Sequence, residues 1–183
     1  MSDPMSALSG AKFDGFAAIR EIGPQGMISL RAAAGEKNLE TAIRSVVGVG
    51  LPASRRIEIS GDKAAAWMSP DEFLLVMPYN QTTTAMASLN KALSGTHYLA
   101  AVVSDARAVF RIEGPKADQV LAKLCPVDLQ TFARGEIRRT RVAQVAAAFW
   151  RDGDGFTLVC FRSVAGYVMG LLAHSAMPGS DLN

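Results

Sequence analysis

An internal duplication constrains the fold of this chain more than any other feature of its amino-acid sequence. Residues 55–76 align with residues 138–159 without a gap, at an offset of 83 positions, and nine of the 22 aligned pairs are identical. The identical pairs include Trp67 with Trp150 and Phe73 with Phe156. Because a repeated sequence predicts a repeated structure, we expect two similar halves packed as one domain, and 183 residues suffice for that.

Hydrophobic periodicity predicts the same order of elements in both copies. In the first copy we expect two paired strands, a helix, three strands and a second helix, at residues 15–22, 27–32, 39–47, 56–60, 64–68, 73–77 and 82–93. In the second copy the corresponding elements are expected at residues 97–103, 108–113, 115–124, 138–144, 145–150, 156–161 and 163–175. The predicted fold class is therefore α+β, with duplicated ββαβββα units, mostly antiparallel sheets and flanking helices.

These elements set the expected boundaries of the two copies. We predict a flexible N-terminus at residues 1–14, a first repeat at 15–95, a second repeat at 96–176 and a flexible C-terminus at 177–183. The paired strands at the start of each repeat are expected to form hairpins, the first through the turn Gly23-Pro24-Gln25-Gly26. Gly166 and Gly170, four residues apart in the last helix, predict close packing of that helix on a sheet.

Composition and charge argue for a cytoplasmic globular protein. The chain is 49% apolar and 20% charged with a net charge of +2, which favours neither nucleic acid nor a membrane as a partner. Residues 1–10 lack the basic and apolar regions of an export signal. Cys125 and Cys160 have the spacing of neither a zinc site nor a redox pair, so we expect two small buried side chains in a reducing compartment.

The residue types that carry acid–base and metal chemistry are scarce. His97 and His174 are the only histidines, and no motif surrounds either, so both are expected to have structural roles. Metal ligands at close spacing and phosphate-binding glycine loops are also missing from the sequence. We therefore predict no catalytic, cofactor-binding or metal-binding residue in this chain.

A basic run is the main candidate for an interaction surface. It contains Arg134, Arg138, Arg139 and Arg141. Strand alternation places Arg139 and Arg141 on one face and Arg138 on the other. The run fits either a solvated strand and loop or an interface with an acidic partner, because arginines bind carboxylates through forked hydrogen bonds. RNA is disfavoured, since no aromatic side chains alternate with the arginines as stacking platforms.

One stretch of the second copy resembles a known family. The stretch runs from residue 104 to 129, with a continuation near residue 162, and the matching positions include Ser104, Asp105, Arg107, Gly114, Pro115, Cys125, Pro126, Asp128 and Arg162. In these residues the chain is similar to the gamma subunit of heterotetrameric sarcosine oxidase. That family is similar in fold to the folate-binding domain of aminomethyltransferases, which is also a duplicated arrangement.

The resemblance implies a role within a larger enzyme. It implies alpha, beta and delta subunits as partners, in a complex that oxidises sarcosine to glycine and hydrogen peroxide and transfers the one-carbon unit to tetrahydrofolate. It also implies that FAD, FMN, NAD, tetrahydrofolate and zinc bind the other subunits, and that the gamma chain is structural and contributes to assembly.

Two other functions remain open from the sequence alone. The first is a stand-alone folate or pterin carrier, for which Asp105 and Asp128 are the acids available in the matched stretch to pair with a pterin ring. A turn or helix-cap role is the alternative for each. The second is an independent enzyme, which would have to turn over sarcosine without partners, and we expect no such activity.

Overall fold

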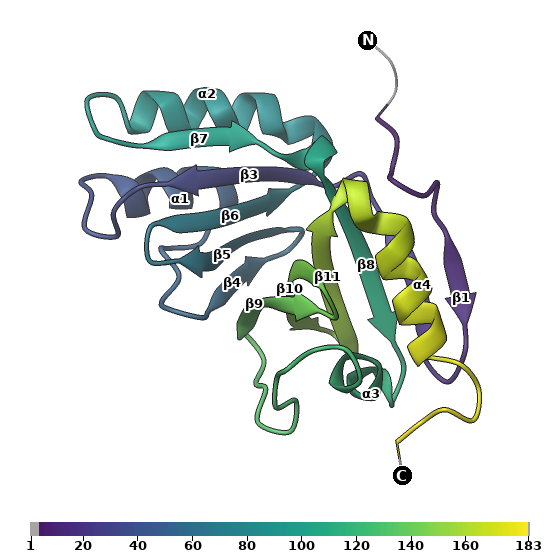
Figure 1. Cartoon of the computed structure of the whole chain (residues 1–183). Helices are drawn as coiled ribbons and strands as arrows, with labels where there is room; N and C mark the ends of the chain where they lie inside the picture. Colours follow the sequence, from purple (N-terminus) through teal and green to yellow (C-terminus); the bar gives the residue numbers. More distant parts are fainter. Residues whose placement is uncertain (1–3, 183) are drawn as a thin grey trace. The chain divides into compact units, whose positions relative to one another are not determined.

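The computed structural model describes residues 4–182, and within them the chain forms two antiparallel sheets with helices against them (Figure 1). Contacts divide the chain into two compact units, residues 25–104 and residues 1–24 together with 105–183. Every strand pairing in both sheets is antiparallel. This architecture confirms the predicted α+β class.

The unit formed by residues 25–104 contains a five-stranded sheet in the order β4-β5-β6-β3-β7. Its elements are β3 (Gly26–Arg31), α1 (Leu39–Val47), β4 (Ile57–Ser60), β5 (Lys63–Ser69), β6 (Glu72–Met77), a 3-10 turn (Tyr79–Gln81), α2 (Thr82–Ala92) and β7 (Leu99–Val102). Helices α1 and α2 contact one face of the sheet and each other. Helix α1 ends as predicted, because Gly48 takes the left-handed conformation (φ 78°) that closes a helix.

The other unit contains a six-stranded sheet in the order β1-β2-β8-β11-β10-β9. Its elements are β1 (Lys12–Asp14), β2 (Ala18–Ile22), a 3-10 turn (Ser104–Ala106), β8 (Arg107–Glu113), α3 (Ala117–Ala122), β9 (Ile137–Val142), β10 (Val145–Asp152), β11 (Gly155–Phe161), a 3-10 turn (Arg162–Val164) and α4 (Ala165–Ser175). Helices α3 and α4 contact this sheet and each other. Helix α3 begins later than predicted, because Gly114 (φ 118°) and Pro115 form a turn before it.

Each sheet takes one strand from the other repeat. Strand β2 pairs with β8, and β7 pairs with β3, so the two predicted hairpins at the start of the repeats do not form. The segment 23–26 connects strands of different sheets instead of reversing the chain within one. The compact units therefore have boundaries that differ from those of the predicted repeats, 15–95 and 96–176. The repeats describe similarity along the sequence and not compact units of the structure.

A cluster of three phenylalanines fills the helix-facing side of the six-stranded sheet. The ring centroids of Phe132 and Phe149 lie 5.2 Å apart, and those of Phe149 and Phe156 lie 6.0 Å apart in an edge-to-face arrangement. Such pairs add about 0.5–1.5 kcal/mol beyond the burial of their area. The ring of Phe156 also lies 4.7 Å from the guanidinium carbon of Arg151, so the cluster supports that side chain.

The N-terminal segment is anchored, in contrast to the predicted flexible residues 1–14, of which 1–3 lie outside the described residues. The carboxylate of Glu21 is buried and accepts hydrogen bonds from Ser6 Oγ at 2.8 Å, Leu8 N at 3.1 Å and Gly10 N at 2.7 Å. Strand β1 then pairs with β2 at the edge of the six-stranded sheet. A buried carboxylate requires such donors, and the segment supplies them.

The C-terminal segment is also anchored, although residues 177–183 were predicted to be flexible and Asn183 lies outside the described residues. Lys123 Nζ donates to the carbonyl oxygen of Ser175 at 2.7 Å and to Ser180 Oγ at 3.1 Å. The backbone amide of Leu182 donates to Gln119 Oε1 at 2.7 Å. These bonds hold the segment after α4 against α3.

Candidate functional site

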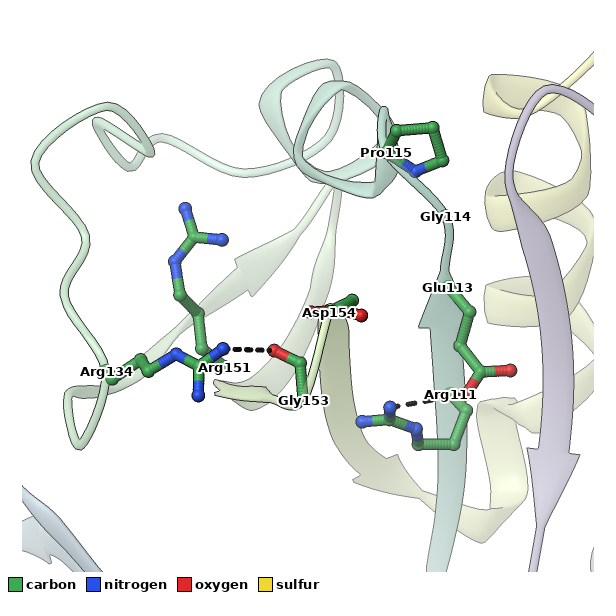
Figure 2. A pocket seen from close by; sticks show the side chains of 9 residues that line it. Arg111, Glu113, Gly114, Pro115, Arg134, Arg151, Gly153 and Asp154 are labelled. Carbon is green, nitrogen blue, oxygen red and sulfur yellow. Dashed lines mark hydrogen bonds and ion pairs between the residues drawn. The ribbon is translucent and has the colours of Figure 1, made fainter.

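A cavity of about 750 Å³ lies at the β10–β11 turn of the six-stranded sheet (Figure 2). Three arginines and two acidic residues supply its charged lining. The complete set of lining residues is Arg111, Glu113, Gly114, Pro115, Arg134, Arg151, Gly153, Asp154 and Gly155. The residues come from the end of β8, the loop before β9 and the hairpin between β10 and β11.

Gly155 brings these segments together. A Cβ atom at this position would lie 2.1 Å from the carbonyl oxygen of Ile112, so only glycine allows β8 and β11 to approach this closely. Asp152 pairs with Gly155 across the hairpin, which leaves Gly153 and Asp154 as the two turn residues. The end of β8 and the turn therefore lie next to each other at the cavity.

Arg151 is held by two backbone carbonyl oxygens and an aromatic ring. Its Nε donates to the carbonyl oxygen of Phe132 at 2.8 Å, and its Nη2 donates to that of Leu129 at 3.2 Å. Its guanidinium also lies over the ring of Phe156, 4.7 Å from the centroid. Nη1 has no hydrogen-bond partner within residues 4–182, which leaves one donor group of a fixed cation available.

The charge of Arg111 is compensated within the chain. Its Nη1 lies 2.9 Å from Asp152 Oδ2, and its Nη2 lies 3.3 Å from Glu113 Oε1. It also donates to Thr157 Oγ1 at 3.1 Å, and its side chain is only 16% exposed. Arg111 therefore stabilises the hairpin end more than it offers charge to a ligand.

Arg134 is exposed and interacts with the turn. Its Nη2 donates to the carbonyl oxygen of Gly153 at 3.3 Å, the contact that Figure 2 shows as a dashed line. No carboxylate in the described part of the chain lies within ion-pair distance of Arg134 or Arg151. These two cations thus remain uncompensated at the cavity.

The structure separates the four arginines of the predicted basic run. Only Arg134 lines the cavity. Arg138 pairs in register with Phe149, forms an ion pair with Glu136 and lies 5.9 Å from the centroid of the Phe132 ring, so it belongs to the helix-facing side of the sheet. Arg139 and Arg141 are exposed on the other side, as strand alternation predicted. Sequence reasoning missed Arg111 and Arg151, because neither belongs to a cluster along the chain.

The family-matching residues from 104 to 115 occupy a connection and a turn. Ser104 is buried, and its Oγ accepts a hydrogen bond from the amide of Met27 at 2.9 Å. Asp105, the next residue of the same 3-10 turn, is exposed. The guanidinium of Arg107 lies 4.2 Å from the centroid of the Phe161 ring. Gly114 and Pro115 line the cavity, so two matched residues contribute to the candidate site.

The matching residues from 125 to 128 have structural positions. Cys125 is 7% exposed, and Pro126 after it is exposed. Asp128 is exposed, and its carboxylate accepts hydrogen bonds from the amide of Gln130 at 3.0 Å and from Thr131 Oγ1 at 3.1 Å. Asp128 thus closes a turn, which is the alternative to pterin recognition that its sequence context left open.

Both thiols are buried, as predicted, and burial controls their ionisation. Loss of hydration raises the pKa of Cys125 to about 12. The same effect raises the pKa of Cys160 to about 11, although the nearby Arg107 charge lowers it in part. Since the thiolate is the nucleophilic form, neither side chain is activated for nucleophilic chemistry at neutral pH.

The remaining candidate residues do not converge. His97 and His174 are both exposed, one before β7 and the other near the end of α4. Within residues 4–182, no group of three or more His, Cys, Asp or Glu side chains is arranged to hold a metal ion. None of the helices described is both long enough and apolar enough to span a bilayer.

Comparison with known proteins identifies the family of this chain. The model of the sarcosine oxidase, gamma subunit family matches residues 31–177. The sarcosine oxidase subunit gamma of Corynebacterium sp. (strain U-96) is 33% identical over 156 residues, which are 81% of this chain and 74% of the relative. The corresponding subunit of an Arthrobacter species is 31% identical over 153 residues, again 81% of this chain and 73% of the relative.

Solved structures agree with the sequence comparison. A chain of the heterotetrameric sarcosine oxidase from Corynebacterium sp. U-96, solved with pyrrole 2-carboxylate, superposes with a TM-score of 0.81 at 28% identity, covering 90% of this chain and 87% of that one. The glycine cleavage system aminomethyltransferase T from Bartonella henselae superposes with a TM-score of 0.63 at 15% identity, covering 83% and 44%. The second likeness confirms the aminomethyltransferase-like fold.

Proposed function

Because the chain belongs to the sarcosine oxidase gamma subunit family, we propose that it acts as the gamma subunit of a heterotetrameric sarcosine oxidase. The observation that carries this proposal is the superposition on a chain of such an oxidase, with a TM-score of 0.81 over 90% of this chain. A likeness over nearly the full length supports the same role in an assembly, and not only a shared domain.

The proposal assigns the chemistry to the partners. The alpha, beta and delta subunits would bind FAD, FMN, NAD and tetrahydrofolate, oxidise sarcosine to glycine and hydrogen peroxide, and transfer the one-carbon unit to tetrahydrofolate. The gamma chain would assemble and stabilise the complex without an active site of its own. The cytoplasmic location predicted from the sequence is part of the same proposal.

The side chains at the cavity support a binding role. Guanidinium groups are hydrogen-bond donors without an acceptor atom, so Arg134 and Arg151 can hold an anion at the cavity, whereas Arg111 is already paired with Glu113 and Asp152. The two thiols are buried, with pKa values of about 12 and about 11, and cannot supply a thiolate near pH 7. This set of groups favours recognition over catalysis.

Co-expression with the alpha, beta and delta chains of the complex tests the proposal. We expect all four chains to co-elute at 1:1:1:1 stoichiometry in size-exclusion chromatography. Omission of this chain should lower the yield and thermal stability of the complex, while turnover per assembled flavin stays unchanged. Elution of the chain by itself, with oxidase yield and stability unaffected by its omission, would refute the assembly role.

A second measurement tests the absence of an active site. The purified chain is mixed with sarcosine and oxygen, and hydrogen peroxide is followed with a peroxidase-coupled dye. We expect no production above a buffer control. Peroxide formation proportional to the concentration of the purified chain would assign an active site to it and overturn this part of the proposal.

A further inference from the structure

We infer that the cavity at the β10–β11 turn is a binding site for a carboxylate monoanion. The starting observation is a pair of cations, Arg134 and Arg151, that line the cavity and have no acidic partner within residues 4–182. A cavity lined by two such guanidinium groups is suited to a planar carboxylate, which accepts forked hydrogen bonds from arginine.

Arg151 is organised in advance for this role. The ring of Phe156 supports its guanidinium plane from one side, and two backbone carbonyl oxygens hold Nε and Nη2. A ligand that binds Nη1 therefore does not have to immobilise a flexible side chain, which is a large cost in most arginine contacts. In Figure 2 the Arg134 side chain points at the turn residue Gly153, and the guanidinium of Arg151 projects in a different direction, away from the turn.

The charge balance of the lining selects the class of anion. Three arginines and two carboxylates, Glu113 and Asp154, line the cavity, and the carboxylate of Asp152 lies beside it in contact with Arg111, so positive and negative charges balance there. Arg111 pairs with Glu113 and with Asp152, and Asp154 is exposed on the turn. A monoanion therefore meets less repulsion from the nearby carboxylates, Asp154 above all, than a phosphate dianion or a polyanion does.

The volume leaves room for more than the carboxylate itself. About 750 Å³ lies within the range of small-molecule sites, which is roughly 300–1,000 Å³. The carboxylate can belong to a free organic acid or to an acidic side chain of a partner subunit. Occupation by a partner's acidic side chain rests on the proposed function, whereas occupation by a free organic acid does not.

Titration of the full chain with sodium acetate tests the site directly. The probes are the Nε–Hε signal of Arg151 and the backbone amide of Gly153 in nitrogen–proton correlation spectra. We expect saturable shifts with acetate and weaker binding of sodium phosphate at the same ionic strength. Shifts that do not saturate, or tighter binding of phosphate than of acetate, would overturn the inference.

Two exposed substitutions at the cavity change the charge in opposite directions. Arg134→Ala should weaken acetate binding about tenfold, the loss expected for one charge-assisted contact. Asp154→Asn should strengthen it several-fold, because a repelling carboxylate is removed. Arg141→Ala, an exposed arginine of β9 outside the cavity, is the matched control and should change nothing. Equal acetate affinities in all of these variants would contradict the site. The three substituted residues are exposed, so the variants are expected to fold like the parent chain.

The assembled complex distinguishes the two sources of the carboxylate. If a partner side chain occupies the cavity, Arg134→Ala should raise the dissociation rate of the chain from its partners about tenfold, and Arg141→Ala should not. If a free acid occupies it, acetate still binds the isolated chain and assembly is unchanged by Arg134→Ala. Failure of the unmodified chain to assemble would count against the proposed function alone, because acetate binding is measured without partners.

Discussion

The side chain of Arg162 reaches the beginning of the described chain, where its Nη2 donates a hydrogen bond of 3.1 Å to the carbonyl oxygen of Ser6. Its Nη1 donates to the carbonyl oxygen of Met5 at 2.8 Å. Arg162 is one of the family-matching residues. It lies in the turn before α4, and its hydrogen bonds connect this turn to the N-terminal segment. Together with Glu21, it holds residues 5–10 near the edge of the six-stranded sheet.

Replacement of Arg162 by Ala should release this segment while the fold persists. We expect the free energy of unfolding to fall by about 1 kcal/mol, because two partly exposed hydrogen bonds to a cation are lost. Hydrogen exchange should accelerate at the amides of Leu8 and Gly10, measured by mass spectrometry at fixed pH. Arg141→Ala is the control, and equal exchange in both variants would show that Arg162 does not anchor the segment.

The buried thiols should make stability depend on alkaline pH. Burial raises the pKa of Cys125 from 9.0 to about 12, so above pH 9 the unfolded chain loses this proton while the folded chain keeps it. The unfolded state then binds fewer protons, and stability that is complete below pH 9 decreases as pH rises towards the folded pKa. For one thiol, the free energy of unfolding can decrease by at most about 1.4 kcal/mol per pH unit.

Urea unfolding of the parent chain and of Cys125→Ala between pH 8 and pH 10.5 isolates this effect. Lysine and tyrosine titrate in both proteins, so their contribution cancels in the difference. We expect the stability gap between the two proteins to stay constant below about pH 9 and to narrow above it. A gap that does not change over the whole range would contradict a raised pKa at Cys125.

The order of elements was predictable from sequence because it depends on local patterns. The apolar spacing of residues 39–47 and the glycine after them specify a helix and its end without reference to the rest of the chain. Strand partners depend on distant residues. A turn with glycine and proline, such as 23–26, fits a hairpin and a connection between sheets equally well, so the exchange of β2 and β7 could not be read from it.

The candidate site was predictable only in part. Arg134 belongs to a visible basic run, but Arg111 and Arg151 lie 40 residues apart in sequence and reach one cavity because β11 pairs with β8 on one side and with β10 on the other. That proximity depends on Gly155, and a single glycine in a strand has no local signal that distinguishes close approach from a turn. The sequence therefore indicates the cationic character of the surface, and the tertiary structure determines which cations converge.

The repeated tryptophans occupy different environments, although the duplication predicts equivalent core sites. Trp67 pairs with Phe73 and lies on the helix-facing side of its sheet, whereas Trp150 pairs with Thr157, on the side opposite to Phe156. An irregularity between Trp67 and Ser69 shifts the first hairpin by one residue, and a shift of one residue moves side chains to the other face. The ungapped alignment cannot show a bulge.

Alanine substitutions at the two tryptophans should lower the free energy of unfolding by different amounts. Trp150 is 4% exposed, and Trp150→Ala should cost about 3–5 kcal/mol in the free energy of unfolding. Trp67 is only partly buried, so Trp67→Ala should cost clearly less, at about 1–3 kcal/mol. Denaturant melts of both variants test this, and equal losses would favour the equivalent sites that the duplication predicts.

Two glycines in the second repeat should respond to alanine in opposite directions. At Gly155 an added Cβ meets the carbonyl oxygen of Ile112 at 2.1 Å, so Gly155→Ala must push β11 away from β8. We expect the free energy of unfolding to fall by about 1–3 kcal/mol, the usual cost of overpacking, together with loss of acetate binding at the cavity beside it.

At Gly166 an added Cβ meets nothing within 4 Å, which corrects the close packing predicted for this part of α4. Gly166→Ala should therefore raise stability by about 0.5–1 kcal/mol, because alanine is the better helix former. Urea melts of the two variants beside the parent chain provide the measurement, and a stable Gly155→Ala variant that still binds acetate would contradict both the strand contact and its role in forming the cavity.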